Sequence, residues 1–280
     1  ALVKRIGYMR GAVAGLLLMM GGCLLFIVAS DSARFGVFLA ALFVLAAGFY
    51  VDALRGQYLM RWLLAVLGLV MVLIIVAMSR ISMRIVNRSI DEAGEGGAPY
   101  LARPPKRNLA ILCIVLFTLA EFWHPGGRVS GWLACAAAAA LCNLMGDWHV
   151  GRPLLRRWPF MLYAVYVCMA LGYALIGTAL LAGGPGASAG RHLLTMGALG
   201  LSIYVVISIA GRAHCGHPSD ERPWVVQGAL LIGAGAMLRA GAAFAPEAAT
   251  ALLGMAGMCW VGSFGLMALR MLPVLWGPRP

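Results

Sequence analysis

The sequence predicts an all-α protein, a polytopic transmembrane bundle of about nine helices. Two observations indicate this class. Of the 280 residues, 62% are hydrophobic and only 11% are charged, whereas soluble domains carry roughly 45–50% apolar and about 25% charged residues. Apolar runs of about 20 residues, the length that crosses a bilayer as a helix, recur along nearly the whole chain. We therefore expect a lipid bilayer as partner, and we assign the net charge of +12 to membrane-adjacent loops rather than to nucleic-acid binding.

The predicted helices follow one another with short connections. The nine candidate spans are residues 11–30, 35–54, 60–79, 108–124, 129–148, 159–182, 192–211, 224–244 and 248–272. The first three form an N-terminal group, residues 1–79. Residues 80–107 hold DEAGEGGAPYLARPPKR, and this Gly-, Pro- and charge-rich composition predicts a solvated loop. Residues 108–280 form a six-helix core. Its alanine tract at 136–140 favours close helix contact, and the short APEA segment predicts a tight hairpin between the last two helices.

Lys and Arg are distributed unevenly between the two sets of loops. The N-terminal tail and the even-numbered loops hold 8, whereas the odd-numbered loops and the C-terminal end hold 14. The positive-inside rule then predicts a periplasmic N-terminus, a cytoplasmic Pro280 and a cytoplasmic loop 80–107. The chain starts without Met and shows no signal-peptide cleavage site. An outside N-terminus is expected if an odd number of spans precedes residue 1.

Histidines gather at the predicted membrane boundaries. His124 and His192 fall at the outer ends of their spans, and His149, His214 and His217 fall at inner ends. A neutral imidazole is the usual ligand of haem iron and of copper. The alternative, which we favour for any one histidine taken alone, is a half-wet interfacial ring. The seven cysteines stand singly and form no CxxC pair, so neither a disulfide framework nor a thiolate zinc site is expected.

His192 differs because of what shares its helix face. Positions i, i+4 and i+8 place His192, Met196 and Gly200 in line, with Thr195 and Gly197 adjoining. An imidazole and a thioether above glycines form a face that a porphyrin could approach. Small residues at this spacing also let a neighbouring helix approach closely. From spacing alone the two interpretations carry equal weight.

The segment GRAHCGH places His214 and His217 three residues apart. This pair would chelate one metal on a continuing helix, but Gly216 and Pro218 predict that the helix ends there. The alternative is a basic helix C-terminus that complements the helix dipole.

Charged residues inside the apolar segments are Glu121 and Arg239. Intramembrane charges are costly and are usually paired or functional, so we expect an Arg239–Glu121 pair near the outer face. Snorkelling toward the interface is the alternative. Asp147 is expected to be an ordinary span terminus.

Three segments carry a resemblance to a known family. HLLTMGALGLSIYVVISIAGRAHCGH resembles the hallmark of the NnrS family, roughly H-A-L-T-x-G-A-x-G followed by an apolar stretch and T-R-x-x-L-G-H-T-G-R. RPLLRRWPFMLYAVYVCMALGYALIGTALL looks like that family's R-x-P-L-L-W-x-L-H-x-x-Y-x-W-x-x-x-G helix. MSRISMRIVNRSI more loosely resembles its G-R-V-I-P-F-F-T-x-N turn. Arg239 falls where the family has an arginine, and the similarity spans about residues 20–275.

The resemblance implies a bacterial inner-membrane protein associated with haem and copper and with the response to nitric oxide and nitrosative stress in denitrifying and pathogenic bacteria. Family members have about twelve helices, and the first three, with a W-H-x-H-E type motif, have no counterpart here. Tyr163 stands where the family has a helix histidine, and Pro-Ser-Asp follows His217 in place of Thr-Gly-Arg. The matching positions are His192, Thr195, Gly197, Gly200, Arg212, Gly216 and His217.

The resemblance therefore predicts a haem protein, with copper as a second metal. His192 is the expected ligand, with His124 or Met196 as the second axial group, and His214 and His217 complete the candidate metal ligands. Thr195, Gly197, Gly200, Tyr163 and Arg212 are candidate cofactor-binding residues, and the aromatic residues Tyr166, Tyr204 and Trp123 would tune the pocket together with Tyr163. Whether nitric oxide is sensed, bound or turned over is left open. The alternative function is a cofactor-free scaffold that packs against other membrane subunits or a second copy of itself.

Overall fold

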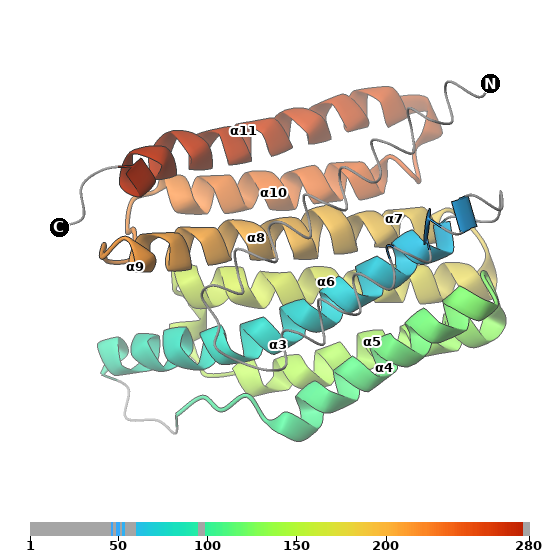
Figure 1. The fold of residues 1–280 in the computed structure, drawn as a ribbon, viewed down its shortest axis with the longest axis horizontal. Helices are drawn as coiled ribbons and strands as arrows, with labels where there is room; N and C mark the ends of the chain where they lie inside the picture. The colour runs from blue at the N-terminus through green and yellow to red at the C-terminus, as the bar shows by residue number, and fades with distance from the viewer. Residues whose placement is uncertain (1–45, 47–48, 51, 54–59, 95–98, 277–280) are drawn as a thin grey trace. The chain divides into compact units, whose positions relative to one another are not determined.

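The computed structural model describes residues 46, 49–50, 52–53, 60–94 and 99–276, and all the regular elements of this part are helical (Figure 1). The chain divides into two units, Ala1–Leu67 and Gly68–Pro280. In the first unit, the Asp52 carboxylate accepts hydrogen bonds from the side chains of Arg61 and Trp62. The predicted span 11–30 and most of the span 35–54 lie outside the described residues.

Helix α3 (Met60–Ala93) is longer than the sequence predicts. It continues through residues 80–93, which were expected to belong to a loop, and ends at Gly94, where φ is +65°. Tyr100 folds back against this extension. The Asn87 amide donates to the Tyr100 carbonyl at 3.1 Å and accepts from the Tyr100 backbone N–H at 2.7 Å. The predicted loop 80–107 is therefore helical as far as Ala93, and the next described helix begins at Pro104.

Helices α4 (Pro104–Trp123), α5 (Arg128–Met145) and α6 (Arg157–Ala182) alternate in direction, so that α5 is antiparallel to both of the others (Figure 1). Two short 3₁₀ turns, η1 (Gly146–Trp148) and η2 (Arg152–Leu155), join α5 to α6. The predicted close contact of the alanine-rich helix is confirmed. A Cβ on Gly177 of α6 would lie 2.8 Å from the Cys135 backbone nitrogen and 2.9 Å from the Gly131 carbonyl oxygen.

The helix that carries His192 runs without a break from Gly186 to His214. It consists of five segments: α7 (Gly186–His192), η3 (Leu193–Leu199), α8 (Gly200–Val206), η4 (Ile207–Gly211) and α9 (Arg212–His214). The segments η3 and η4 are π-helical. A π segment pairs residues five apart instead of four, and such segments are frequent at functional sites. The helix ends before Gly216, where φ is +79°, as Gly216 and Pro218 predict.

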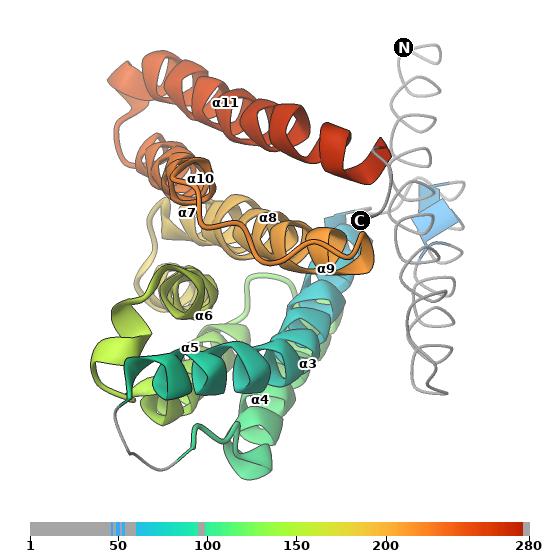
Figure 2. The same cartoon turned by 90° about the vertical axis from the view of Figure 1, so that its left-hand side faces the viewer.

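Helices α10 (Trp224–Gly241) and α11 (Ala249–Trp276) form the predicted hairpin through the short turn η5 (Pro246–Ala248). The Ser263 hydroxyl donates to the Gly228 carbonyl at 2.8 Å and ties the two helices together. Figures 1 and 2 show the helix pair outside the 186–214 helix, with α10 between that helix and α11. The 186–214 helix therefore lies between α6 and α10.

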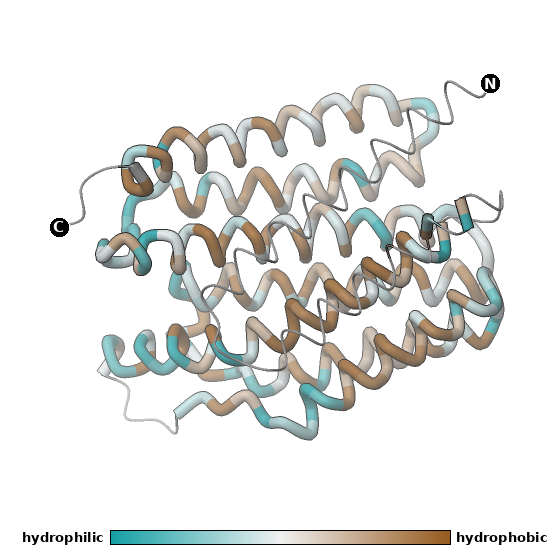
Figure 3. Tube along the Cα trace, viewed as in Figure 1, coloured by the Kyte–Doolittle hydropathy of each residue, from teal (hydrophilic) through white to brown (hydrophobic). Residues whose placement is uncertain are grey.

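Six of the described helices are long and apolar enough to cross a membrane: α3, α5 with η1, α6, the 186–214 helix, α10 and α11 with η5. The twenty-residue α4 is not among them, because Lys106, Arg107 and Glu121 lie in it. Figure 3 shows hydrophobic residues along the helices and hydrophilic residues gathered at helix ends. Large apolar side chains such as Leu230 and Val261, 65% and 76% exposed, point away from the protein. An all-α bundle of membrane-spanning helices is thus confirmed.

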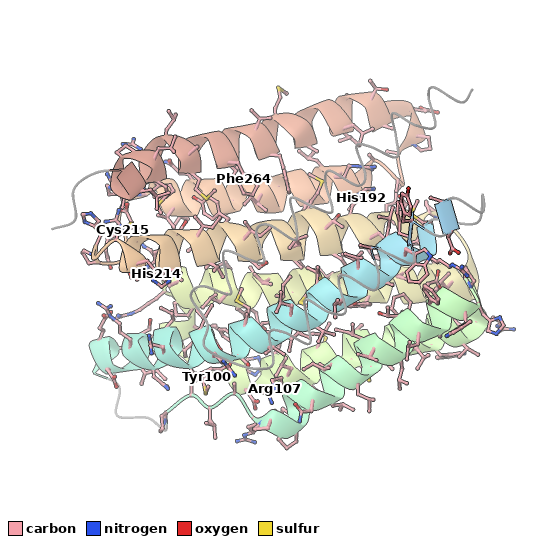
Figure 4. The ribbon with its side chains drawn as sticks, viewed as in Figure 1. Tyr100, Arg107, His192, His214, Cys215 and Phe264 are labelled. Atoms are coloured by element: carbon pink, nitrogen blue, oxygen red, sulfur yellow. The ribbon has the colours of Figure 1, made fainter. Side chains whose placement is uncertain are left out.

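Because successive helices alternate in direction, the unit Gly68–Pro280 has two ends. The His192 end carries the C-termini of α4, α6 and α10 together with the N-termini of α5, α7 and α11. The Asp220 end carries the C-termini of α3, α5, α9 and α11 together with the N-termini of α4, α6 and α10. Figure 4 shows His192 at one end of the bundle, and His214 and Cys215 at the other.

Candidate functional site at His192

His192 lies where the helix changes from α to π geometry. It is the last residue of α7 and directly precedes η3. Its side chain is half-buried, so one part of the ring contacts protein and the other faces outward. Arg239 of α10 and the neighbouring Arg191 are the charged groups that act on the imidazole. The candidate site therefore combines an imidazole with two guanidinium groups. His192 lies in the second turn of the helix, which begins at Gly186 and not at the predicted residue 192.

Thr195 fixes the backbone next to His192. Its hydroxyl donates to the Arg191 carbonyl at 3.0 Å and lies 3.4 Å from the His192 carbonyl. Regular i→i−4 pairing is lost in the π segment, and a side-chain hydroxyl is well placed to satisfy a freed carbonyl. Thr195 thus supports the helix at the candidate site, and its contact with a cofactor stays a prediction.

The helix face that His192, Met196 and Gly200 were predicted to share points toward α10 and α11. Met196 packs against the buried cluster formed by Ala189, Leu193, Ala236 and Ala240. A Cβ on Gly200 would lie 2.9 Å from Cζ2 of Trp260, on α11. The shared orientation is therefore present, and protein side chains already cover this face below His192.

Gly197 makes a similar close contact with α6. A Cβ at this position would lie 3.0 Å from the Cys168 sulfur and 3.5 Å from the Ala236 Cβ. Gly197 and Gly200 thus each have a packing role in the described chain, because each lets a neighbouring helix approach. Contact of either glycine with a cofactor stays a prediction.

The buried carboxylate near the site pairs with a different arginine from the one expected. Glu121 is 5% exposed, and its Oε1 lies 3.5 Å from Nη2 of Arg191. It also accepts the Gly126 backbone N–H at 3.2 Å. The predicted Arg239–Glu121 pair is therefore wrong. Arg191, on α7, reaches Glu121 near the end of α4, whereas Arg239, on α10, does not. Spacing along one helix could not show which neighbouring helix would supply the partner of Glu121.

Arg239 has no ion pair or hydrogen bond with any of the described residues. It lies in the last turn of α10, and its side chain is half-buried. A guanidinium at a membrane boundary with no protein carboxylate is available to an anionic group of a ligand or lipid.

The remaining histidines are spread over both ends of the bundle. His124 is exposed in the turn after α4, at the His192 end, and His149 is exposed after η1. His214 and the half-buried His217 lie at the Asp220 end, the opposite end of the 186–214 helix (Figure 4). Within the described part of the chain, no three His, Cys, Asp or Glu side chains gather as a metal cluster.

Three of the four aromatic residues assigned to the pocket lie away from His192. Tyr163 and Tyr166 surround Trp148, with ring centroids 6.1 and 5.7 Å from the indole, and Tyr100 packs on its other side at 5.1 Å. This cluster lies at the Asp220 end. The Tyr204 hydroxyl donates to the Trp224 carbonyl, and Trp123 is 70% exposed. The structure thus does not bring Tyr163, Tyr166 or Tyr204 to His192.

Asp147 was expected to be an ordinary span terminus. At the Asp220 end it links the end of α5 to the start of α4. Its carboxylate accepts the Lys106 ammonium group at 2.8 Å and lies 3.7 Å from Nε of Arg103. The ion pair between Lys106 and Asp147 holds these two helix ends together.

Sequence reasoning missed the buried carboxylate of Asp220. It is 3% exposed, lies 2.6 Å from Nη2 of Arg222 and 3.4 Å from Nη1 of Arg212, and accepts the Trp224 indole N–H at 3.0 Å. The Arg222 guanidinium holds the pKa of this carboxyl well below its usual range. Arg212, a predicted cofactor-binding residue, also donates to the Pro218 carbonyl. The signal was present in the sequence, since an acid stands between two arginines in the loop where the resemblance departs from the family.

Comparison with known proteins gives one family that matches nearly the whole chain and two curated proteins that match a short stretch of it. No solved structure matches. A stretch of 47 residues, 17% of this chain, is 55% identical to a glucose/galactose transporter of Brucella abortus biovar 1 (strain 9-941) and equally to that of Brucella abortus (strain 2308). The chain spans only 11% of the length of these two proteins, so the likeness carries no argument about transport. The family described as NnrS protein matches residues 2–279, and the chain therefore belongs to the NnrS family.

Proposed function

We propose that this NnrS-family membrane protein serves in the response to nitric oxide and nitrosative stress, or in denitrification, and that it binds haem through His192, with copper as the second candidate metal. The observation that carries the proposal is the half-buried imidazole near the start of the 186–214 helix, which lies in the field of the Arg191 and Arg239 guanidinium groups. A neutral imidazole is a ligand for either metal. A bound haem would supply an iron at which nitric oxide coordinates.

The described residues fit a haem only in part. His192 would supply a nitrogen ligand to the iron. Arg239, which has no carboxylate partner among the described residues, would supply a guanidinium for the propionate groups. Met196, Gly197 and Gly200 are in contact with protein side chains. We therefore assign haem binding to His192 and Arg239. His124, exposed at the same end, remains a candidate for the second ligand.

We extend the proposal to the topology and division of the chain. Nine spans, a periplasmic N-terminus and a cytoplasmic Pro280 in a bacterial inner membrane agree with the alternating helices and the 14-to-8 distribution of Lys and Arg. Residues 1–79 and 108–280 remain the proposed N-terminal group and six-helix core, and the connection between them is cytoplasmic.

A second function is a cofactor-free scaffold that packs against other membrane subunits or a second copy. The contact of Trp260 with Gly200 favours it, because this contact fills the face that a porphyrin was expected to use. The outer surface of α11 is also largely exposed.

An optical spectrum of the purified protein, expressed with sufficient haem and copper, decides between the two functions. We expect a Soret band that His192→Ala abolishes or shifts. The matched control is His149→Ala, since His149 is an exposed histidine at the Asp220 end, and it should leave the band unchanged. Wild-type protein with neither absorbance nor bound metal would refute the haem proposal in favour of the scaffold.

A further inference from the structure

The C-terminal part of α3 carries a row of arginines on one face. Arg80, Arg84 and Arg88 follow at intervals of four residues and are exposed. On a helix this spacing places them on one side. Ser82, Val86 and Ser89 are buried on the opposite side. The row is thus the outward face of a helix segment whose other face packs against the protein.

The position of this row along α3 matches the edge of a membrane. The run Trp62–Ser79 contains no charged residue and ends directly before Arg80. Its 18 residues correspond to about 27 Å of helix, close to the roughly 30 Å of the hydrocarbon core. Arg80 is therefore placed at the boundary of the core, and Arg84 and Arg88 follow within the headgroup region.

Within the part of the chain that the structure describes, no Asp or Glu pairs with Arg80 or Arg84. Neither Arg80 nor Arg84 has an ion pair or hydrogen bond with the described residues. Arg88 pairs with Glu92 at 2.7 Å, but both side chains are largely exposed, and such pairs are weak. The stretch from Met60 to Ile90 holds no Asp or Glu. Among the described residues, these two guanidinium groups at the expected depth of the lipid phosphates thus have no protein partner.

We propose that Arg80 and Arg84, with Arg88 beside them, form a binding site for the phosphate of an anionic phospholipid. A guanidinium accommodates a phosphate through two parallel hydrogen bonds. Basic residues next to a transmembrane helix attract anionic lipids, each with about 1 kcal/mol. The site fixes α3 at a defined depth in the leaflet on the Asp220 side, and it is independent of cofactor binding at His192.

The test compares two double variants that lose the same charge at the same end of the bundle. Arg80→Gln with Arg84→Gln removes the row, whereas Arg152→Gln with Arg270→Gln removes two exposed arginines outside it. Short-chain phosphatidylglycerol is titrated into the detergent-solubilised protein, and the apparent Kd is read from thermal stabilisation. Short-chain phosphatidylcholine and inorganic phosphate are titrated in parallel.

We expect phosphatidylglycerol to stabilise the wild type and the Arg152/Arg270 variant equally. The Arg80/Arg84 variant should bind it roughly 25-fold more weakly, about fivefold for each arginine. Equal weakening of both variants, or stabilisation of the wild type by phosphatidylcholine or inorganic phosphate to the same extent, would overturn the site. If the glutamine variant does not fold, Arg80→Lys with Arg84→Lys keeps the charge. Weakened phosphatidylglycerol binding in that variant supports bidentate recognition, and unchanged binding refutes it.

Discussion

At the scale of single residues, the buried carboxylates Asp220 and Glu121 lie at helix ends, where each links a loop to a neighbouring helix. Asp220 receives two guanidinium groups and an indole N–H in the loop between the 186–214 helix and α10. Glu121 pairs with Arg191 and binds the Gly126 N–H, which holds the turn after α4 against α7. In each case one carboxylate fixes a loop to a helix end.

Asp220→Asn should lower the free energy of unfolding by about 1–3 kcal/mol at neutral pH, because two arginines lose their counter-charge. A carboxyl whose pKa is lowered in the folded state contributes stability above its ordinary pKa of about 3.9 and loses it as pH falls toward the folded value. The stability difference between wild type and variant should therefore narrow as pH drops below about 4.

Thermal unfolding of the detergent-solubilised protein between pH 3 and pH 8 measures this difference. Glu221→Gln, at the exposed neighbouring residue, is the control and should have little effect at any pH. A stability loss in Asp220→Asn that is independent of pH would contradict the electrostatic role.

At the scale of helices, the sequence predicts the existence and order of the described helices well, because long apolar runs must be helical in a bilayer. It misses the extension of α3, because the charged residues Arg80, Arg84 and Arg88 are typical of a loop. The evidence for a helix there is the buried opposite face and the hydrogen bonds of Asn87 with Tyr100, which only the structure shows. The π segments are also not predictable, since they depend on packing between neighbouring helices. For the same reason the partner of Glu121 could not be found by spacing along one helix.

Close packing of the 186–214 helix on α6 depends on glycine at position 190. A Cβ there would lie 2.3 Å from the Gly172 carbonyl oxygen and 3.0 Å from the Ile176 nitrogen. Because both are backbone atoms, Gly190→Ala must push the helices apart, at a cost of about 1–3 kcal/mol.

Gly233→Ala is the matched control, because Gly233 also lies in a helix and has no atom within 4 Å of an added Cβ. It should leave the melting temperature unchanged or raise it slightly, since alanine favours helix over glycine. Equal melting temperatures for the Gly190 and Gly233 variants would show that α6 and the 186–214 helix are not as close as described.

At the scale of the whole molecule, the helices alternate in direction, so only two orientations in the membrane are possible for the unit Gly68–Pro280. Within the unit Gly68–Pro280, the connections after α3, α5 and α9 lie at the Asp220 end together with the end of α11, and the remaining connections lie at the His192 end. The Asp220 end carries the row Arg80, Arg84 and Arg88 as well as Arg152, Arg156, Arg157, Arg212 and Arg222. Fixing the side of one loop therefore fixes the side of His192.

Reporter fusions after Gly94 and after Pro280 should both score cytoplasmic, and a fusion after Gly184, in the turn between α6 and α7, should score periplasmic. The physical reason is the excess of arginine at the Asp220 end, which resists translocation. Opposite signals from Gly94 and Pro280 would contradict the helix alternation itself. A periplasmic signal from both, with a cytoplasmic signal at Gly184, would keep the fold and reverse the orientation. His192 and Arg239 would then face the cytoplasm, and the proposed haem would be supplied from that side.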